Sequence, residues 1–189
     1  MATKVLIVID VQNDFVDGSL RNEEAIKKIP NIVKKIEDFD GNYIFVTRDT
    51  HFPDYLESNE GKHLPVVHCV KNTDGWLINP DVAKALRDKE LSKSNCVISY
   101  INKPTFGSTD LVEKIKSIMI GLKETEIELE FVGFCTDICV VSNVLLCKAT
   151  FYETANISVD ASCCAGVTPE SHAAALLTMK MCQVNVINE

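Results

Sequence analysis

The sequence has no surplus of basic residues and no long apolar segment. Its 19 Lys and Arg residues face 27 Asp and Glu residues, a formal net charge of −8, whereas nucleic-acid binding depends on clustered positive charge. No apolar run approaches the roughly 20 residues that a membrane-spanning helix needs. The first residues reach Asp10 too early for a secretory signal. We therefore expect a cytoplasmic protein that binds neither nucleic acid nor membrane.

The eight cysteines lack the spacing of a structural zinc site. Cys135 and Cys139 are four residues apart and Cys163 and Cys164 are adjacent, so no paired C-x2-C set is present. A chain of 189 residues can bury a core without disulfides, and a reducing compartment keeps thiols free. We expect most of the cysteines to be small buried side chains, with at most one or two taking part in chemistry.

Short apolar segments alternate with segments of helical periodicity, and the chain has no internal repeat or linker. This alternation predicts a single α/β domain over residues 1–189, a doubly wound, Rossmann-like, six-stranded parallel sheet with helices on both faces. The predicted strands are Val5–Asp10, Tyr43–Thr47, Val97–Asn102, Ile127–Phe134, Ile157–Asp160 and Gln183–Ile187. The predicted helices are Asn22–Asp38, Pro80–Lys89, Ser108–Leu122, Asp137–Ala149 and Pro169–Met181.

One segment, residues 48–77, has no clear periodicity and holds three of the four histidines. A loop of this length inside a compact domain is usually functional or disordered, and the histidines favour a functional lid. Ligands of open α/β sheets bind beyond the carboxyl ends of the strands. The positions to search are therefore Asp10, Thr47–His51, Lys103 and Gly133–Cys139.

Three strand-end residues could carry nucleophilic chemistry. Asp10 follows five apolar residues, so burial would raise its pKa toward that of a general base, although a lone Asp there can also be a cap. Lys103 could favour a thiolate or could be a solvated lysine. Cys139 is expected just inside a helix capped by Thr136 or Asp137, where the N-terminus lowers a thiol pKa. Cys135 is the competing nucleophile, and either thiol could be merely buried.

Asp49, His51 and His68 could form a facial set of metal ligands, because Asp and His two residues apart in an extended segment point the same way. Nitrogen and oxygen ligands of this kind suit Zn, Fe or Mn. The alternative is that both histidines are polar lid residues.

Along nearly its whole length the chain resembles the isochorismatase-like cysteine hydrolases, particularly their nicotinamidase/pyrazinamidase branch. The motifs that carry the resemblance are VLIVIDVQNDF, TRDTH, LPVVHCV, INKPTFGSTDL, VGFCTDICV and TPESHAAAL. The resemblance implies a catalytic triad of Asp10, Lys103 and Cys139. It also implies a cis peptide bond before Cys135, and an oxyanion hole formed by the backbone N–H groups of Cys135 and Cys139.

The resemblance further implies a divalent metal ion, Zn or else Fe or Mn, held by Asp49, His51 and His68. The fourth ligand varies among relatives; Glu60 is the first candidate here, followed by Glu57 and His63. Relatives are often dimers or tetramers, so a homo-oligomer is expected. His172 resembles a structural or interface residue of the family and is given no catalytic role.

The substrate pocket departs from the family pattern. Phe15 matches the aromatic residue that lines the pyridine pocket, and we expect Phe106 and Phe134 to line it as well. Many nicotinamidases place a Trp shortly before the metal histidine, but residues 63–68 contain no aromatic residue and the single Trp is Trp76. Family members that hydrolyse isochorismate lack the nucleophilic cysteine, so Cys139 argues against that reaction.

These features predict an amidohydrolase that forms a thioester on Cys139 and releases ammonia from a small amide. Nicotinamide, giving nicotinate, is the leading substrate; another small amide, carbamoyl or ureido compound is the alternative. A hypothesis of a different class is a thiol redox or binding protein in which Cys135 and Cys139 form a reversible pair.

Overall fold

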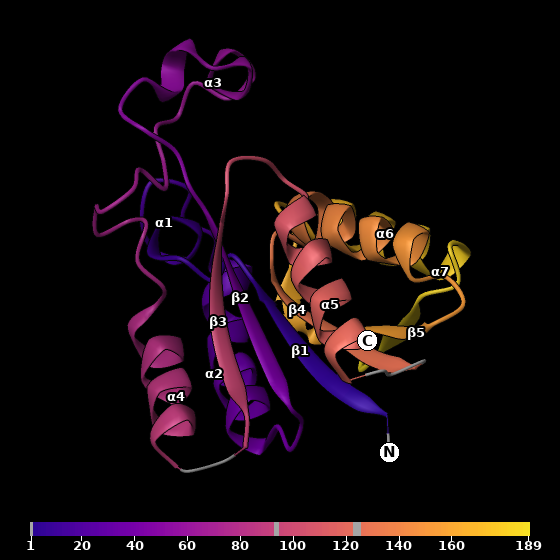
Figure 1. Ribbon diagram of the computed structural model, residues 1–189. Helices are drawn as coiled ribbons and strands as arrows, with labels where there is room; N and C mark the ends of the chain where they lie inside the picture. The colour runs from indigo at the N-terminus through magenta and orange to yellow at the C-terminus, as the bar shows by residue number, and fades with distance from the viewer. Residues whose placement is uncertain (1, 93–94, 123–125) are drawn as a thin grey trace.

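The computed structural model describes residues 2–92, 95–122 and 126–189, which include a sheet of six strands (Figure 1). All neighbouring strands are parallel, and their order is β3-β2-β1-β4-β5-β6. The strand order therefore reverses direction between β1 and β4, as in doubly wound α/β folds. The predicted fold class is confirmed. The strands are β1 (Thr3–Ile9), β2 (Tyr43–Asp49), β3 (Val97–Lys103), β4 (Ile127–Phe134), β5 (Ala155–Ala165) and β6 (Asn185–Ile187).

Helices cover both faces of the sheet and enclose two apolar clusters (Figure 1). On one face α2 (Glu23–Asp38) and α4 (Pro80–Leu91) pack on Leu6 and Val8 of β1. On the opposite face, Val5, Ile7 and Ile9 of β1 belong to the second cluster. There they pack with the remaining long helices, α5 (Thr109–Leu122), α6 (Val141–Thr150) and α7 (Pro169–Met181). Burial on both faces explains why β1 is an almost unbroken apolar run. None of the helices within the described ranges has both the length and the hydropathy to cross a membrane.

β5 is longer than the predicted strand Ile157–Asp160, because it continues through the segment Ala161–Ala165. Its register against β4 shifts between Phe131 and Gly133, where the chain of β5 carries extra residues. A bulge of this kind lets a strand continue after its regular pairing is interrupted. The small and polar residues there do not have the β-branched pattern by which a strand is recognised, so the sequence predicted an early end.

The irregular segment contains two short helices, η1 (Tyr55–Glu57) and α3 (Asn59–His63), and α3 stands away from the sheet (Figure 1). A further single turn, α1 (Asn13–Val16), follows β1. Elements this short show no helical periodicity, which is why the sequence predicted none of them.

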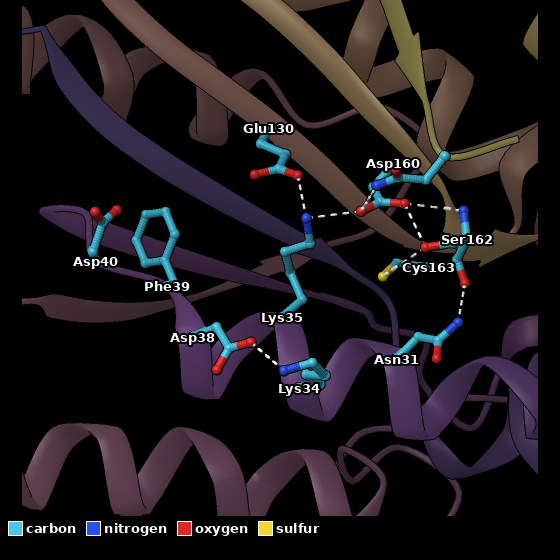
Figure 2. A pocket seen from close by; sticks show the side chains of 11 residues that line it. Asn31, Lys34, Lys35, Asp38, Phe39, Asp40, Glu130, Asp160, Ser162 and Cys163 are labelled. Carbon is cyan, nitrogen blue, oxygen red and sulfur yellow. Dashed lines mark hydrogen bonds and ion pairs between the residues drawn. The ribbon is translucent and has the colours of Figure 1, made fainter.

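A cluster of charged residues fastens α2 to the sheet on the side of β5 (Figure 2). The ammonium group of Lys35 lies 2.7 Å from a carboxylate oxygen of Glu130 and 2.7 Å from one of Asp160. Asp160 also accepts hydrogen bonds from Ser162 and from Asn188 near the C-terminus. A cavity of about 430 Å³ adjoins the cluster. Since Lys35 of α2 pairs with a carboxylate on each of two strands, β4 and β5, we interpret the cluster as a structural tie.

Candidate active site

The carboxyl ends of four adjacent strands bring four chemically reactive side chains together. Asp10 follows β1, and Asp49 and Lys103 are the last residues of β2 and β3. Cys139 lies in the π-helical turn η2 (Thr136–Val140), directly after β4. The group therefore occupies the point between β1 and β4 at which the strand order reverses, where open α/β sheets bind their ligands.

Lys103 lies between the other members of the group. Its Nζ is 2.6 Å from Oδ2 of Asp10 and 3.4 Å from Sγ of Cys139, to which it donates a hydrogen bond. A second carboxylate, that of Asp49, is 3.8 Å from the same Nζ. Asp10, Lys103 and Cys139 are all buried. One buried ammonium group thus contacts both a candidate base and a candidate nucleophile.

Burial controls the ionisation of the base and the thiol. Burial raises the pKa of Asp10, although the charge of Lys103 opposes the change. Burial and then the charge of Asp10 raise the pKa of the Cys139 thiol, while Lys103 lowers it. Burial thus makes the Cys139 thiol a weaker acid and the Asp10 carboxylate a stronger base. In such a pair the proton can move from sulfur to oxygen as the sulfur attacks.

Lys103 keeps its positive charge in this environment. Burial alone would lower its pKa, but the carboxylate charges of Asp10 and Asp49 raise it above the usual value. Its Nζ also donates to the carbonyl oxygen of Thr105 at 3.1 Å. A permanently charged, held ammonium can stabilise negative charge that develops on a neighbouring sulfur.

The backbone of Asp10 adopts an uncommon conformation with φ of 48°. Residues other than glycine seldom occupy this region, and Asp tolerates it better than most. The hydroxyl of Thr47 donates to Oδ1 of Asp10 at 2.7 Å and accepts from the Asp10 N–H at 3.2 Å. The neighbouring strand thus holds the carboxylate, leaving Oδ2 toward Lys103.

The turn from β4 to η2 allows close approach of the backbone to β1. Gly133 has φ of 118°, and a Cβ at this position would collide with the carbonyl oxygen of Ile9. The peptide bond between Phe134 and Cys135 is cis, as the family resemblance implies. The prediction that Thr136 or Asp137 caps this helical turn is wrong. The N-cap position is occupied by Cys135, and no side chain accepts a capping hydrogen bond there.

The two expected caps bind other segments instead. The hydroxyl of Thr136 lies 2.8 Å from Nδ1 of His172 in α7, and the Asp137 carboxylate accepts from the N–H of Val167 at 3.1 Å. The side chains that precede Cys139 therefore tie the turn to the loop before α7 and to α7 itself. His172 thus makes a structural contact with the turn.

Four candidate metal ligands converge beside Lys103. One ligand atom from each of Asp49, His51, Glu60 and His68 lies within 4.8 Å of the others. Oδ2 of Asp49 is 3.0 Å from Nε2 of His51 and 3.4 Å from Nε2 of His68. Burial and the Asp49 charge raise the pKa of Glu60. Two imidazoles and two carboxylates on one side of a cavity suit a divalent ion such as Zn, Fe or Mn.

Glu60 joins this group, whereas Glu57 and His63 do not belong to it. Oε1 of Glu60 lies 3.6 Å from His51 Nε2 and 3.7 Å from His68 Nε2. The side chain of His63 is exposed, and its Nδ1 lies 2.8 Å from the carbonyl oxygen of Asn59. Glu60 sits in the first turn of α3, so this short helix aims it at the histidines.

A cavity of about 870 Å³ opens onto the reactive group and the metal ligands. Its lining includes Cys139, Asp49, Glu60, His68, and the aromatic residues Phe15 and Phe106. Phe134 packs instead in the apolar cluster between the sheet and α2. Its strand position explains the difference, since Phe134 ends β4 with its side chain directed to the face opposite Phe131.

Trp76 and Tyr55 pack against residues in and next to the irregular segment. The guanidinium of Arg48 lies 4.0 Å from the centre of the Trp76 ring, and the Trp76 indole N–H donates to Thr50. The ring of Tyr55 packs 4.6 Å from that of His51 and 5.0 Å from that of His68, measured between ring centres. Tyr55 was missed in the sequence because no periodicity marks its position.

The sequence reasoning also missed Gln12, whose buried side-chain amide binds the backbone of Asp49. Its position offered only a weak signal, because Gln12 stands among the polar residues Asp10, Asn13 and Asp14. A buried amide needs partners, so such a residue predicts a specific contact. The identity of the partner depends on the irregular segment and could not be read from spacing.

Comparisons with known proteins extend over nearly the whole chain. The isochorismatase domain model matches residues 4–189. The isochorismatase family protein PncA of Bacillus subtilis strain 168 is 29% identical over 178 residues, covering 92% of this chain and 92% of that protein. A crystal structure of nicotinamidase/pyrazinamidase PncA from Bacillus subtilis has a TM-score of 0.81 at 25% identity, covering 98% and 100% of the two chains. The structure of a Pyrococcus horikoshii pyrazinamidase in complex with zinc has a TM-score of 0.74 at 25% identity, covering 98% and 99%.

Proposed function

The chain belongs to the isochorismatase family of hydrolases, and we propose that it hydrolyses a small carboxamide through a thioester on Cys139. The observation that carries this proposal is the contact of one buried ammonium, that of Lys103, with Asp10 at 2.6 Å and with Cys139 at 3.4 Å. A base, a charge-stabilising group and a thiol at these distances are what nucleophilic attack on a carbonyl requires.

In the first half of the reaction, Asp10 accepts the thiol proton of Cys139 as the sulfur attacks the carboxamide carbon. The backbone N–H groups of Cys135 and Cys139 stabilise the resulting oxyanion. Asp10 then donates its proton to the departing nitrogen, the C–N bond breaks, and ammonia leaves. The acyl group remains on the sulfur as a thioester.

In the second half, Asp10 removes a proton from water and the hydroxide attacks the thioester. The C–S bond breaks, the carboxylic acid is released, and the proton returns to the sulfur of Cys139. Lys103 stabilises the thiolate in both halves by its positive charge. Asp10 thus alternates between base and acid, for which a carboxyl of raised pKa is suited.

Nicotinamide is the proposed substrate, and nicotinate the product. Support comes from the relatives named as nicotinamidases and from the two phenylalanines, Phe15 and Phe106, beside the ligand group. A divalent ion held by Asp49, His51, Glu60 and His68, with zinc the first candidate, would bind the pyridine nitrogen and so orient the amide. The cavity of about 870 Å³ also leaves room for the alternative class of amide, carbamoyl or ureido substrates.

An ammonia-release assay with a Cys139→Ala variant tests the reaction. Ammonia release should disappear in Cys139→Ala, and it should persist in Cys182→Ala, which removes an exposed cysteine that does not line the cavity. Activity that survives in Cys139→Ala but is lost in Cys135→Ala would show that Cys135, and not Cys139, is the nucleophile. Running the wild-type protein on nicotinamide, pyrazinamide and carbamoyl compounds, with and without chelator, identifies the substrate and its metal dependence.

The thiol redox alternative has less support. Burial raises the pKa of Cys135 to about 12, and that of Cys139 rises as well. Neither cysteine is thereby held as a reactive thiolate at neutral pH.

All eight cysteines are free, in keeping with the proposed cytoplasmic location. A homo-oligomer, dimer or tetramer, is also proposed, and light scattering on the purified protein measures its mass.

A further inference from the structure

We propose that Gln12 is a positioning residue that holds Asp49 in place and thereby sets the affinity of the metal site. The inference rests on the proposed metal-binding role of Asp49, His51, Glu60 and His68. Gln12 itself touches none of the reacting groups through its side chain. Its side chain instead binds backbone groups, including both backbone groups of the proposed ligand Asp49.

The side-chain amide of Gln12 binds both backbone groups of Asp49. Its Oε1 accepts from the Asp49 N–H at 2.7 Å, and its Nε2 donates to the Asp49 carbonyl oxygen at 2.9 Å. The same Nε2 donates to the carbonyl oxygen of Trp76 at 3.0 Å. Gln12 is completely buried, so water cannot replace these bonds if they are lost.

The position of Asp49 in the sheet explains why it needs this clamp. β1 pairs with β2 only as far as Val8 against Val46, and the chain turns away at Asp10. On the other side β3 continues beyond that point, and Thr50 donates to the carbonyl oxygen of Lys103. Beyond the end of β1, the amide of Gln12 takes the place of a strand neighbour for Asp49.

A displacement of Asp49 would alter two sets of contacts at once. Its Oδ2 faces the two imidazoles of His51 and His68, at 3.0 and 3.4 Å, and its Oδ1 is 3.8 Å from Lys103. Groups that orient metal ligands contribute to affinity because they remove the freedom of the ligand before the ion arrives. Loss of the Gln12 bonds should therefore weaken metal binding even when the fold survives.

The test compares zinc affinity in two Gln12 variants with a control from the same turn. Gln12→Met removes both hydrogen-bonding groups at similar length, and Gln12→Glu keeps an acceptor for the Asp49 N–H but loses the donor. Asn13→Ala is the control, because the Asn13 amide binds the carbonyl oxygen of Asp74, which belongs to no ligand residue. Zinc dissociation constants are measured on metal-free protein by competition with a chromophoric chelator, and folding by circular dichroism and thermal melting.

We expect zinc binding to weaken by about 10–100-fold in Gln12→Met and by less in Gln12→Glu, as for other groups that orient ligands. The Asn13→Ala control should keep the wild-type affinity. Folded Gln12 variants with unchanged affinity would overturn this inference alone. Wild-type protein that binds no zinc would overturn the proposed metal site together with it. If neither Gln12 variant folds, Gln12 is needed for the fold as a whole, which contradicts the local role proposed.

Discussion

At the scale of single residues, the environment of Asp10 determines what it can do. An Asp at the end of an apolar strand is unremarkable in sequence, but here it is fully buried between a hydroxyl and an ammonium group. Its pKa is raised by burial and held down in part by Lys103. These opposed effects leave a carboxylate that is more basic than one in water.

The pH profile of an Asp10→Asn variant examines this environment. We expect kcat to fall by about 10²–10⁴-fold, the usual contribution of a positioned acid or base. In the wild-type protein kcat/KM should rise with pH through a pKa above the ordinary value of 3.8, because the active form of Asp10 is the carboxylate. The residual activity of the variant should lack this acid limb. An identical limb in the variant would assign it to another group.

At the scale of elements, the turn from β4 to η2 sets where Cys139 lies. Its geometry depends on Gly133, whose backbone passes against the carbonyl oxygen of Ile9 in β1. A side chain there would push β4 and β1 apart at the point where their ends carry Cys139 and Asp10. The position of this turn is therefore sensitive to a single methyl group added at residue 133.

Gly133→Ala should destabilise the protein by about 1–3 kcal/mol from its backbone conformation alone, with the collision adding to this. Gly121→Ala is the matched control in the exposed part of α5, where an added Cβ meets no atom within 4 Å. The control should instead stabilise by about 0.5–1 kcal/mol, since Ala favours a helix. Urea unfolding of both variants gives the two values, and equal effects would refute the steric explanation.

The tie between α2 and β5 makes a second prediction for elements. Burial alone would raise the pKa of Asp160, but its bonds to Lys35, Ser162 and Asn188 lower it overall. Its stabilising contribution is therefore present above the ordinary value of 3.8 and is lost as pH falls through the lowered pKa. Asp160→Asn should cost about 1.5–3 kcal/mol at neutral pH, as for bonds to a charged group.

Urea unfolding as a function of pH measures this contribution, and the difference between wild type and Asp160→Asn should shrink in acid. Asp38→Asn serves as the control, because its ion pair with Lys34 on the same helix is solvent-exposed (Figure 2). It should change stability little, since exposed pairs are screened by solvent. A difference for Asp160→Asn that persists unchanged at low pH would contradict the role of its charge.

At the scale of the whole molecule, the metal ligands connect the irregular segment to the sheet. Asp49 ends a central strand, whereas Glu60 and His68 come from the segment that stands beyond it (Figure 1). An ion held by these residues would cross-link the two parts of the folded chain. Binding to the folded state alone raises stability in proportion to the logarithm of ligand concentration.

Zinc at about 100 times its dissociation constant should therefore stabilise the protein by about 2.7 kcal/mol, seen as a higher Tm that a chelator reverses. Glu60→Gln should reduce this gain, whereas Glu57→Gln, an exposed residue three positions away, should retain it. Thermal melts with and without zinc make the comparison. An equal gain in both variants would remove Glu60 from the ligand set.

Local patterns in the sequence were sufficient to predict the parallel sheet and most of its reactive edge. Strand periodicity and helix signals are local, so Asp10, Lys103 and Cys139 could be placed at strand ends, and strand ends of a parallel sheet share one edge. The family motifs added the choice of Cys139 over Cys135. The acidic balance argued against nucleic acid as a partner but did not bear on the reaction.

Contacts between distant segments required the folded chain. Glu57, Glu60 and His63 lie within seven residues of one another, and only the turn of α3 directs one of them at the histidines. The partner of Gln12 lies 37 residues away, and Phe134 faces the core because of the register of β4. Side-chain direction in irregular segments follows from packing against the rest of the molecule, which has no period that a sequence can display.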